Sequence, residues 1–455
     1  MEQQLDNRAR TWWQDRSTVL FFVLAAFLIW VPEYAFFWRD EWEFLQGFRT
    51  KDPSFFLQDH YGHIKPVFKV FYFLELMGFG TNVILFSYTN LVLFGICNYV
   101  VFRLVRSVST ERSAWIVATI TTIHPLMFNH LGWTFQVCIT LHLLFQALAV
   151  LYFVRWALNT DRSLVPVFVF TVLQHYSFGN GLFLPVLFAA GAFIFKRGRE
   201  RYGMALGMIL AWFVFISIQL LFGGDRQEGA LAPDAIPAMI RGGLYFIGAI
   251  TSSTYFLREG VLGSITPWLA SGIFLVAVVL AFTNKQRDRR LALFLTLWFV
   301  ITMCSIPIVM QDGLVNKKLP HYYFALSMVP MALIFEHALG NRWSLGPKLR
   351  SALAASALIA FVGIFMIDQH LKTLFSYRSM RNMQYMQKNI AEGTPYRGFD
   401  EPYFIVAVPR MPEPSGLYMY WRSKDLFRLP FVPDKLETAI AKLNADSART
   451  ATEKP

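Results

Sequence analysis

A short polar stretch, Arg39-Asp40-Glu41-Trp42-Glu43, directly follows the first long apolar run of the chain. Charged side chains are costly near a bilayer core, so a cluster at the end of such a run indicates a functional site. Adjacent carboxylates can act as a general base toward a hydroxyl group, and they can also ligate a hard divalent cation. We therefore predict that Asp40 and Glu41 are catalytic. The alternative is that these charges solvate a helix end and pair locally.

A second group of chemically capable residues follows in the stretch Asp59-His-Tyr-Gly-His-Ile-Lys-Pro. Its members His60, His63 and Lys65 are spaced for one turn or a compact bend. A lysine ammonium is a compact charge suited to phosphate, and histidines can donate hydrogen bonds or ligate a metal. Carboxylates beside phosphate-binding cations are the groups that a transferase with a phosphate-linked donor needs.

The composition shows what kind of protein must position these groups. The 455 residues are 55% hydrophobic and 17% aromatic, and only 16% are charged, whereas soluble domains carry roughly 25% charged residues. Apolar stretches of roughly 18 to 22 residues recur along the chain, and each is long enough to cross a bilayer. The sequence therefore predicts an all-α polytopic membrane protein.

We expect about eleven transmembrane helices. The first, 18–37, is too long for a signal-peptide core and lacks a small-residue cleavage site, so it is predicted to be retained. The others are 83–102, 114–130, 135–156, 164–177, 182–195, 202–222, 264–282, 291–310, 321–337 and 352–367. The segment 244–257 is shorter than a typical span and is predicted to be re-entrant or interfacial.

With these spans, most of the basic loop residues fall on one side of the membrane. Lys and Arg concentrate in the loops 103–112, 155–162, 196–201, 285–290 and 342–350, all on the side of the N-terminus. By the positive-inside rule the N-terminus is cytoplasmic, and the first loop and the C-terminus face outward, into the periplasm if this is a bacterial inner membrane.

The chain is predicted to have two parts. Residues 1–368 form a transmembrane catalytic module whose large first external loop, 38–82, holds the active site. Within that loop, 67–76 is amphipathic and interrupted by charges, which predicts a helix lying at the interface. Residues 369–455 differ in composition and are expected to form a small external α+β cap or tail.

Several other functions are disfavoured by the same residues. The net charge is +12, but the Lys and Arg residues lie between apolar runs rather than along one face, so we expect no nucleic-acid partner. The three cysteines fall inside predicted spans, which argues against a disulfide framework or a thiolate metal site. No P-loop or dinucleotide fingerprint is visible. His124, His130 and His142 are expected to be satisfied buried histidines.

The layout resembles a known superfamily. An external Asp-Glu pair after the first span, followed by a Lys-Pro element that leads into an amphipathic helix, resembles the GT-C polyprenyl-phosphate-dependent glycosyltransferases. The nearest type is the protein O-mannosyltransferase and lipid A aminoarabinose-transferase type, which has Lys-Pro-Pro where this chain has Lys65-Pro66-Val67. The resemblance implies that Asp40 is the catalytic carboxylate, Glu41 its acidic neighbour and Lys65 the lysine of that element.

Two further stretches are candidates for the same site. In His175-Tyr-Ser-Phe-Gly-Asn-Gly the glycines permit a tight turn, and His175 and Asn180 could contact a sugar. The alternative is an ordinary connection between helices.

The second stretch precedes a late span. Lys317 and Lys318 stand alone among the short external loops, which suggests an anionic partner, and His321 and Tyr322 follow them. The alternative is interfacial anchoring.

The predicted reaction moves a sugar from a polyprenyl-phosphate donor to an envelope acceptor such as a glycolipid, lipopolysaccharide, another polysaccharide or a protein. Phosphate contacts are assigned to Lys65, Lys317, Lys318 and His63, and sugar or acceptor contacts to His60, His175, Asn180, His321 and Tyr322. Asp40 is the general base of an inverting transfer. No cofactor is required; a divalent cation would use Asp40, Glu41 and His60. The alternatives are an O-antigen polymerase or ligase and a non-catalytic transporter or flippase of lipid-linked sugars.

Overall fold

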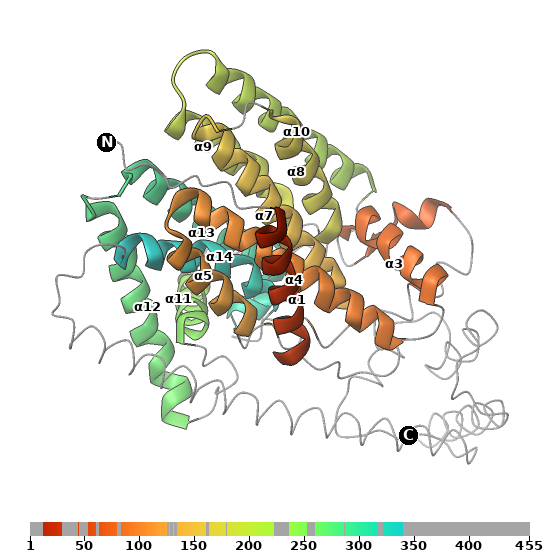
Figure 1. Ribbon diagram of the computed structural model, residues 1–455, viewed down its shortest axis with the longest axis horizontal. Helices are drawn as coiled ribbons and strands as arrows, with labels where there is room; N and C mark the ends of the chain where they lie inside the picture. The colour runs from red at the N-terminus through yellow and green to blue at the C-terminus, as the bar shows by residue number, and fades with distance from the viewer. Residues whose placement is uncertain are drawn as a thin grey trace, which may run out of the picture.

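The described part of the protein, seen in a computed structural model, is built almost entirely of helices (Figure 1). The structure describes residues 12–29, 44, 53–60, 63–79, 83–124, 127, 131, 134–160, 163–178, 180–222, 236–252, 260–285, 287–315 and 322–339. The predicted span 352–367 and the C-terminal part 369–455 lie outside the described residues, so the count of about eleven spans and the division into two parts stay predictions.

Four of the described helices are long and apolar enough to cross a membrane. They contain the segments Ile84–Val108, Val137–Ala157, Glu200–Phe222 and Ile265–Thr283, and three shorter apolar helices accompany them. The second of these segments is 83% buried inside the protein, whereas the third and fourth are only 17% and 33% buried. Helices that expose apolar side chains to this extent are stable beside lipid and would be a liability in water.

The N-terminal helices pack in chain order. Helix α1 (Trp12–Ile29) lies against α4 (Val83–Val108), which also contacts α5 (Glu111–Ile123) and α7 (Val137–Ala157). Helix α7 in turn packs against α8 (Val165–Phe178), and α9 (Leu184–Phe195) packs against α10 (Glu200–Phe222). The short helices η3 (Thr134–Gln136) and η4 (Asn180–Phe183) lead into α7 and α9.

The helices α11 to α14 pack against one another and against the N-terminal helices. Helix α11 (Ile236–Ser252) packs against α12 (Gly260–Thr283), and α14 (Tyr322–Leu339) contacts both α12 and α13 (Arg289–Val315). Helix α13 also contacts α9, and α14 contacts α5. The ring of Phe153 on α7 joins the two groups, because it stacks on Phe188 of α9 at 4.7 Å and on Phe294 of α13 at 5.2 Å between ring centroids.

The first loop contains the elements that position the candidate site. A 3₁₀ turn, η1 (Pro53–Phe56), is followed by two short antiparallel strands, β1 (Asp59–His60) and β2 (His63–Ile64), in which His60 pairs with His63. Helix α3 (Pro66–Phe79) begins directly after Lys65. Proline is favoured at the first helical position because its missing N–H would have no partner there. The compact bend and the amphipathic helix predicted for this loop are both present.

Helix α3 divides its residues between two faces. Phe68, Lys69, Tyr72, Glu75 and Leu76 are buried, while Val70, Leu74 and Met77 are exposed. An exposed apolar stripe at helical spacing suits the interfacial position predicted for this segment.

Two predicted elements differ from the structure. Helix α5 ends at Ile123 rather than at residue 130, because His124 precedes Pro125 and adopts extended backbone angles of −65° and 128°. A residue before proline is driven out of the helical region by steric clash. The segment predicted at 244–257 is helix α11, which begins eight residues earlier; it packs so closely on α12 that a Cβ on Gly248 would lie 1.5 Å from the Pro267 carbonyl oxygen.

Candidate functional site

Lys65 lies at the junction of strand β2 and helix α3. Its backbone carbonyl accepts a hydrogen bond from the Lys69 N–H at 3.0 Å, so Lys65 caps the helix that Pro66 begins. Both Lys65 and His63 are buried, with 4% and 7% of their surface exposed. A lysine is rarely buried unless its charge is used, which makes this position a candidate for function.

The aromatic ring of Phe178, the last residue of α8, brings two predicted stretches together. The Lys65 ammonium lies 5.2 Å from the centroid of this ring and 5.6 Å from that of Phe135. The His63 ring lies 6.0 Å from the Phe178 ring, centroid to centroid. Ammonium groups at such distances are attracted by the ring faces. The Lys-Pro element and the turn after His175 therefore meet in space, although they are far apart in the sequence.

Two polar residues complete this group. The Nε2 atoms of His142 on α7 and Gln174 on α8 lie 2.7 Å apart, and the His142 ring meets Phe178 edge-on at 6.0 Å. We call His63, Lys65, Phe135, His142, Gln174 and Phe178 the Phe178 cluster.

The Phe178 cluster has unused hydrogen-bonding capacity. His142 Nδ1 and Gln174 Oε1 are buried and have no hydrogen-bond partner among the described residues. The prediction that His142 is a satisfied buried histidine is therefore wrong for one of its two ring nitrogens. The signal in the sequence was weak: a single histidine in α7, and a glutamine next to the residue that drew attention, His175.

His175 points to a different neighbour. Its ring is buried and stacks on Phe215 of α10 at 4.3 Å with an interplanar angle of 10°. Its Nδ1 atom has no hydrogen-bond partner among the described residues. The hydroxyl of Ser177, two residues further on, donates to the Leu173 carbonyl of its own helix at 2.7 Å. Asn180 begins η4, and the position of its side chain is outside what the structure describes.

The remaining predicted site residues are outside the described part of the chain. Asp40, Glu41, Lys317, Lys318 and His321 are not described, nor are the side chains of His60 and Tyr322. Within the described residues, no group of three His, Cys, Asp or Glu side chains is arranged to hold a metal ion. A divalent cation at Asp40, Glu41 and His60 stays a prediction.

Lys69 has a structural role that its place in the sequence did not indicate. Its ammonium donates hydrogen bonds to the carbonyl oxygens of Phe55 at 2.6 Å and Gln58 at 2.8 Å. It also lies 4.3 Å from the centroid of the Phe55 ring. Lys69 thus attaches the turn η1 to helix α3 and holds this part of the loop in place beside Lys65.

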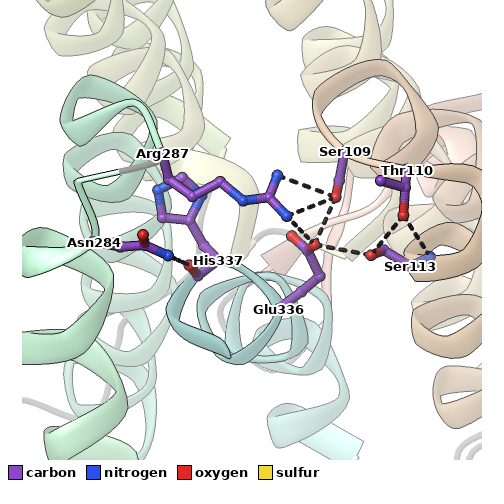
Figure 2. Close-up of polar contacts among 7 residues, drawn as sticks. All are labelled: Ser109, Thr110, Ser113, Asn284, Arg287, Glu336 and His337. Carbon is purple, nitrogen blue, oxygen red and sulfur yellow. Dashed lines mark hydrogen bonds and ion pairs between the residues drawn. The ribbon is translucent and has the colours of Figure 1, made fainter. Parts of the chain in front are cut away.

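A second polar cluster lies where the α4–α5 and α12–α13 connections meet the end of α14 (Figure 2). One oxygen of Glu336, Oε1, accepts hydrogen bonds from Ser109 at 2.5 Å, from Ser113 at 2.9 Å and from Arg287 at 2.8 Å. Arg287 also donates to the Ser109 hydroxyl from both terminal nitrogens at 3.3 Å. We call Ser109, Ser113, Arg287 and Glu336 the Glu336 cluster.

Neighbouring contacts extend the Glu336 cluster. Thr110 caps helix α5 by accepting from the Ser113 N–H at 3.2 Å, and the Asn284 amide donates to the His337 carbonyl at 3.0 Å (Figure 2). Within the described chain, Arg287 Nε has no partner. Two loops that the sequence assigns to one side of the membrane, 103–112 and 285–290, are therefore in direct contact.

Other basic loops are tied down by similar contacts. Arg103 Nη1 lies 3.1 Å from Asp15 Oδ2, which joins the end of α4 to the start of α1. Lys196 donates to the Asn159 side chain and lies 4.9 Å from the centroid of the Trp156 ring. These contacts join the connection after α7 to the connection after α9.

No protein-family model matches the chain, and no curated protein matches it. Four chains of solved structures match. One is the Archaeoglobus fulgidus oligosaccharyltransferase, crystallised with an acceptor peptide containing the NVT sequon tethered by a disulfide bond. The identity is 14% and the TM-score 0.49, and the match covers 80% of this chain and 55% of that chain. This chain thus spans about half the length of that enzyme chain.

Proposed function

We propose that this protein is a membrane glycosyltransferase that moves a sugar from a polyprenyl-phosphate donor to an envelope acceptor. The observation that carries the proposal is the burial of Lys65 between the Phe135 and Phe178 rings, in the loop that also carries Asp40 and Glu41. In a low-dielectric site an ammonium attracts a phosphate far more strongly than in water. The Lys-Pro element, the external Asp-Glu pair and the apolar spans together match the GT-C layout.

The phosphate of the donor is held by Lys65, with His63 as a hydrogen-bond donor and Lys317 and Lys318 as further cations. As the bond between the anomeric carbon and the phosphate oxygen breaks, negative charge grows on the phosphate. Cations placed before the reaction stabilise that charge without reorganisation. The released group is the polyprenyl phosphate.

The acceptor hydroxyl is activated by Asp40, with Glu41 as its acidic neighbour. Asp40 takes the hydroxyl proton while the acceptor oxygen forms a bond to the anomeric carbon from the side opposite the leaving phosphate, so the configuration inverts. His60, His175, Asn180, His321 and Tyr322 contact the sugar or the acceptor. A divalent cation is not needed for these steps, and Asp40, Glu41 and His60 are the residues that would hold one.

We place the protein in a bacterial inner membrane with a cytoplasmic N-terminus and a periplasmic active site and C-terminus. The support is the charge pattern of the loops and the contact between two basic loops at the Glu336 cluster. The acceptor side chain or glycan then lies in the same compartment as the first loop, and the donor reaches the site from the surrounding lipid.

The test is sugar transfer by the purified protein. Radiolabelled undecaprenyl-phosphate sugars and a cell-envelope acceptor extract are supplied to wild type, Asp40→Asn and Lys65→Ala. The matched control is Lys285→Ala, which removes the same charge from an exposed position. We expect label in the acceptor with wild type and the control only.

Two results would contradict this proposal. Wild-type rates in Asp40→Asn would remove the role of that residue as the base. Movement of labelled lipid across vesicles without any transfer would indicate a transporter of lipid-linked sugars instead of an enzyme.

A further inference from the structure

The contact between His142 and Gln174 leaves two hydrogen-bonding positions unused in the protein interior. Both residues are 1% exposed, and their Nε2 atoms are 2.7 Å apart. His142 Nδ1 and Gln174 Oε1 have no hydrogen-bond partner among the described residues. A buried polar group without a partner costs free energy, so two such groups on a pair of hydrogen-bonded residues indicate that something else completes them.

The chemistry of these two positions follows from the bond between the residues. If the Gln174 amide donates to His142 Nε2, then the neutral ring carries its hydrogen on Nδ1, which leaves Nδ1 as a donor and Oε1 as an acceptor. If the amide is turned around, it accepts from Nε2–H, and the two unused positions exchange their roles. In both cases one donor and one acceptor remain.

The surroundings show which ligand could use this pair. The His142 ring lies 6.0 Å from the Phe178 ring, and the Lys65 ammonium lies 5.2 Å from the same ring. His142 and Lys65, the residue of the proposed phosphate site, therefore contact the same aromatic ring. A sugar hydroxyl both donates and accepts hydrogen bonds, and the C–H face of a sugar packs well on an aromatic ring.

We propose that His142 and Gln174 bind hydroxyl groups of the transferred sugar while Lys65 holds its phosphate. This inference rests on the proposed function and names the residues that select the sugar. A site built to hydrogen-bond a substrate hydroxyl discriminates strongly against an analogue that lacks it, since the buried polar groups are then left unpaired. The pair is thus a determinant of donor specificity.

Gly181 is the positioning residue of this pair. A Cβ at this position would lie 2.0 Å from Gln174 Oε1 and 2.7 Å from Gln174 Nε2. Contacts shorter than about 3 Å force a side chain to move, so Gly181→Ala displaces the amide from His142 without removing any polar group. Glycine at position 181 therefore permits the predicted tight turn and also leaves room for the Gln174 amide.

The experiment measures dissociation constants by tryptophan fluorescence for undecaprenyl phosphate and for its mannose, glucose and galactose conjugates. Selectivity is the dissociation constant of the sugar-free lipid divided by that of the best conjugate. We expect His142→Phe, Gln174→Leu and Gly181→Ala each to lower selectivity by about five- to tenfold, the effect of one lost hydrogen bond. Affinity for undecaprenyl phosphate should not change in these variants.

Two controls separate this role from a general loss of structure. Thr171→Val changes a buried residue one turn away on α8 whose hydroxyl bonds its own helix at 2.7 Å, and it should keep wild-type selectivity. Conjugates lacking single sugar hydroxyls are also tested with wild type and Gln174→Leu. At one or two sugar positions, loss of the hydroxyl should weaken binding of the conjugate to wild type but not to Gln174→Leu. This comparison tests the inference even if the other variants fail to fold.

The outcomes distinguish failure of this inference from failure of the proposed function. Unchanged selectivity in the folded variants, or a wild type that does not prefer any conjugate, overturns the role of His142 and Gln174 and leaves the Lys65 site standing. If wild type binds neither lipid and transfers no sugar, the proposed function itself fails, and the inference fails with it.

Discussion

The Phe178 cluster and the Glu336 cluster are both polar and largely buried, yet they use their hydrogen bonds differently. At the Glu336 cluster opposite charges meet at 2.8 Å, and one carboxylate oxygen accepts three hydrogen bonds. At the Phe178 cluster the hydrogen bond between His142 and Gln174 leaves a buried donor and a buried acceptor without partners in the described chain.

This difference separates stability from function. In the Glu336 cluster, the ion pair and its hydrogen bonds join three parts of the chain. Glu336 Oε1 already accepts three hydrogen bonds, so it has no capacity left for a ligand. Buried polar atoms without a partner are costly unless a substrate or water completes them. Changes in the Glu336 cluster should therefore affect stability, and changes in the Phe178 cluster should affect activity.

The largest expected effect is on activity in the Phe178 cluster. Lys65→Met keeps the apolar stem but removes the cation, so we expect transfer to fall by about 100- to 1,000-fold, the range seen when one preorganised electrostatic contact is removed. The measurement is initial transfer rate with Lys285→Met as control, beside thermal unfolding in detergent. A loss of less than about threefold would show that Lys65 does not hold the phosphate.

The next effect should be on stability at the Glu336 cluster. Glu336→Gln leaves Arg287 largely buried without its counter-ion, since the two side chains are only 10% and 13% exposed. Breaking a buried pair in this way costs about 3 kcal/mol or more. We expect a clear drop in the unfolding temperature, with part of it restored in Arg287→Met/Glu336→Leu. An unchanged unfolding temperature in the single variant would mean that the pair does not stabilise the protein.

An intermediate effect is expected at Lys69, next to the candidate site. Lys69→Met removes the two hydrogen bonds to the Phe55 and Gln58 carbonyls, and a bond from a charged donor contributes about 1.5–3 kcal/mol. Faster amide hydrogen exchange should appear in residues 53–58 and at the start of α3, while the helices α7 to α10 keep their protection. If exchange rises equally throughout the chain, Lys69 does not act as a local attachment.

The smallest effect is expected from an exposed pair near the Glu336 cluster. Partial burial alone would raise the pKa of the Asp288 carboxyl, but hydrogen bonds from Arg290 and its charge outweigh this and hold the pKa below its ordinary value of 3.8. Because the folded-state pKa is lowered, this contribution to stability is present above about pH 4 and is lost as the pH falls through the folded-state pKa.

Asp288→Asn tests that small contribution. The amide can still accept the 2.9 Å hydrogen bond from the Arg290 N–H that caps α13, but it loses the negative charge and one of the two oxygens that accept hydrogen bonds from the Arg290 guanidinium. With side chains 35% and 52% exposed, the pair should contribute only a few tenths of a kcal/mol. Unfolding temperatures of the variant and wild type should differ slightly at pH 7 and converge near pH 3. A difference that persists at pH 3 would mean that the charge is not responsible.

The helices themselves could be predicted well from the sequence, because apolar runs of bilayer length have few alternatives. The predicted spans 135–156 and 202–222 correspond closely to α7 and α10. The prediction failed where local backbone chemistry outweighed hydropathy, as at the His124–Pro125 end of α5. Glu75 and Lys69 were seen only as interruptions of an amphipathic helix, and both are buried.

The sequence by itself determined that the chain forms apolar helices, that basic residues cluster between them and that Lys65 precedes a helix, since these properties depend on residues close together in the chain. Only the tertiary structure decided that Phe178 meets Lys65, that Gln174 meets His142 and that Arg287 meets Glu336 and Ser109. Such contacts join residues from different helices, and which faces of those helices meet depends on packing of the whole bundle rather than on any local pattern.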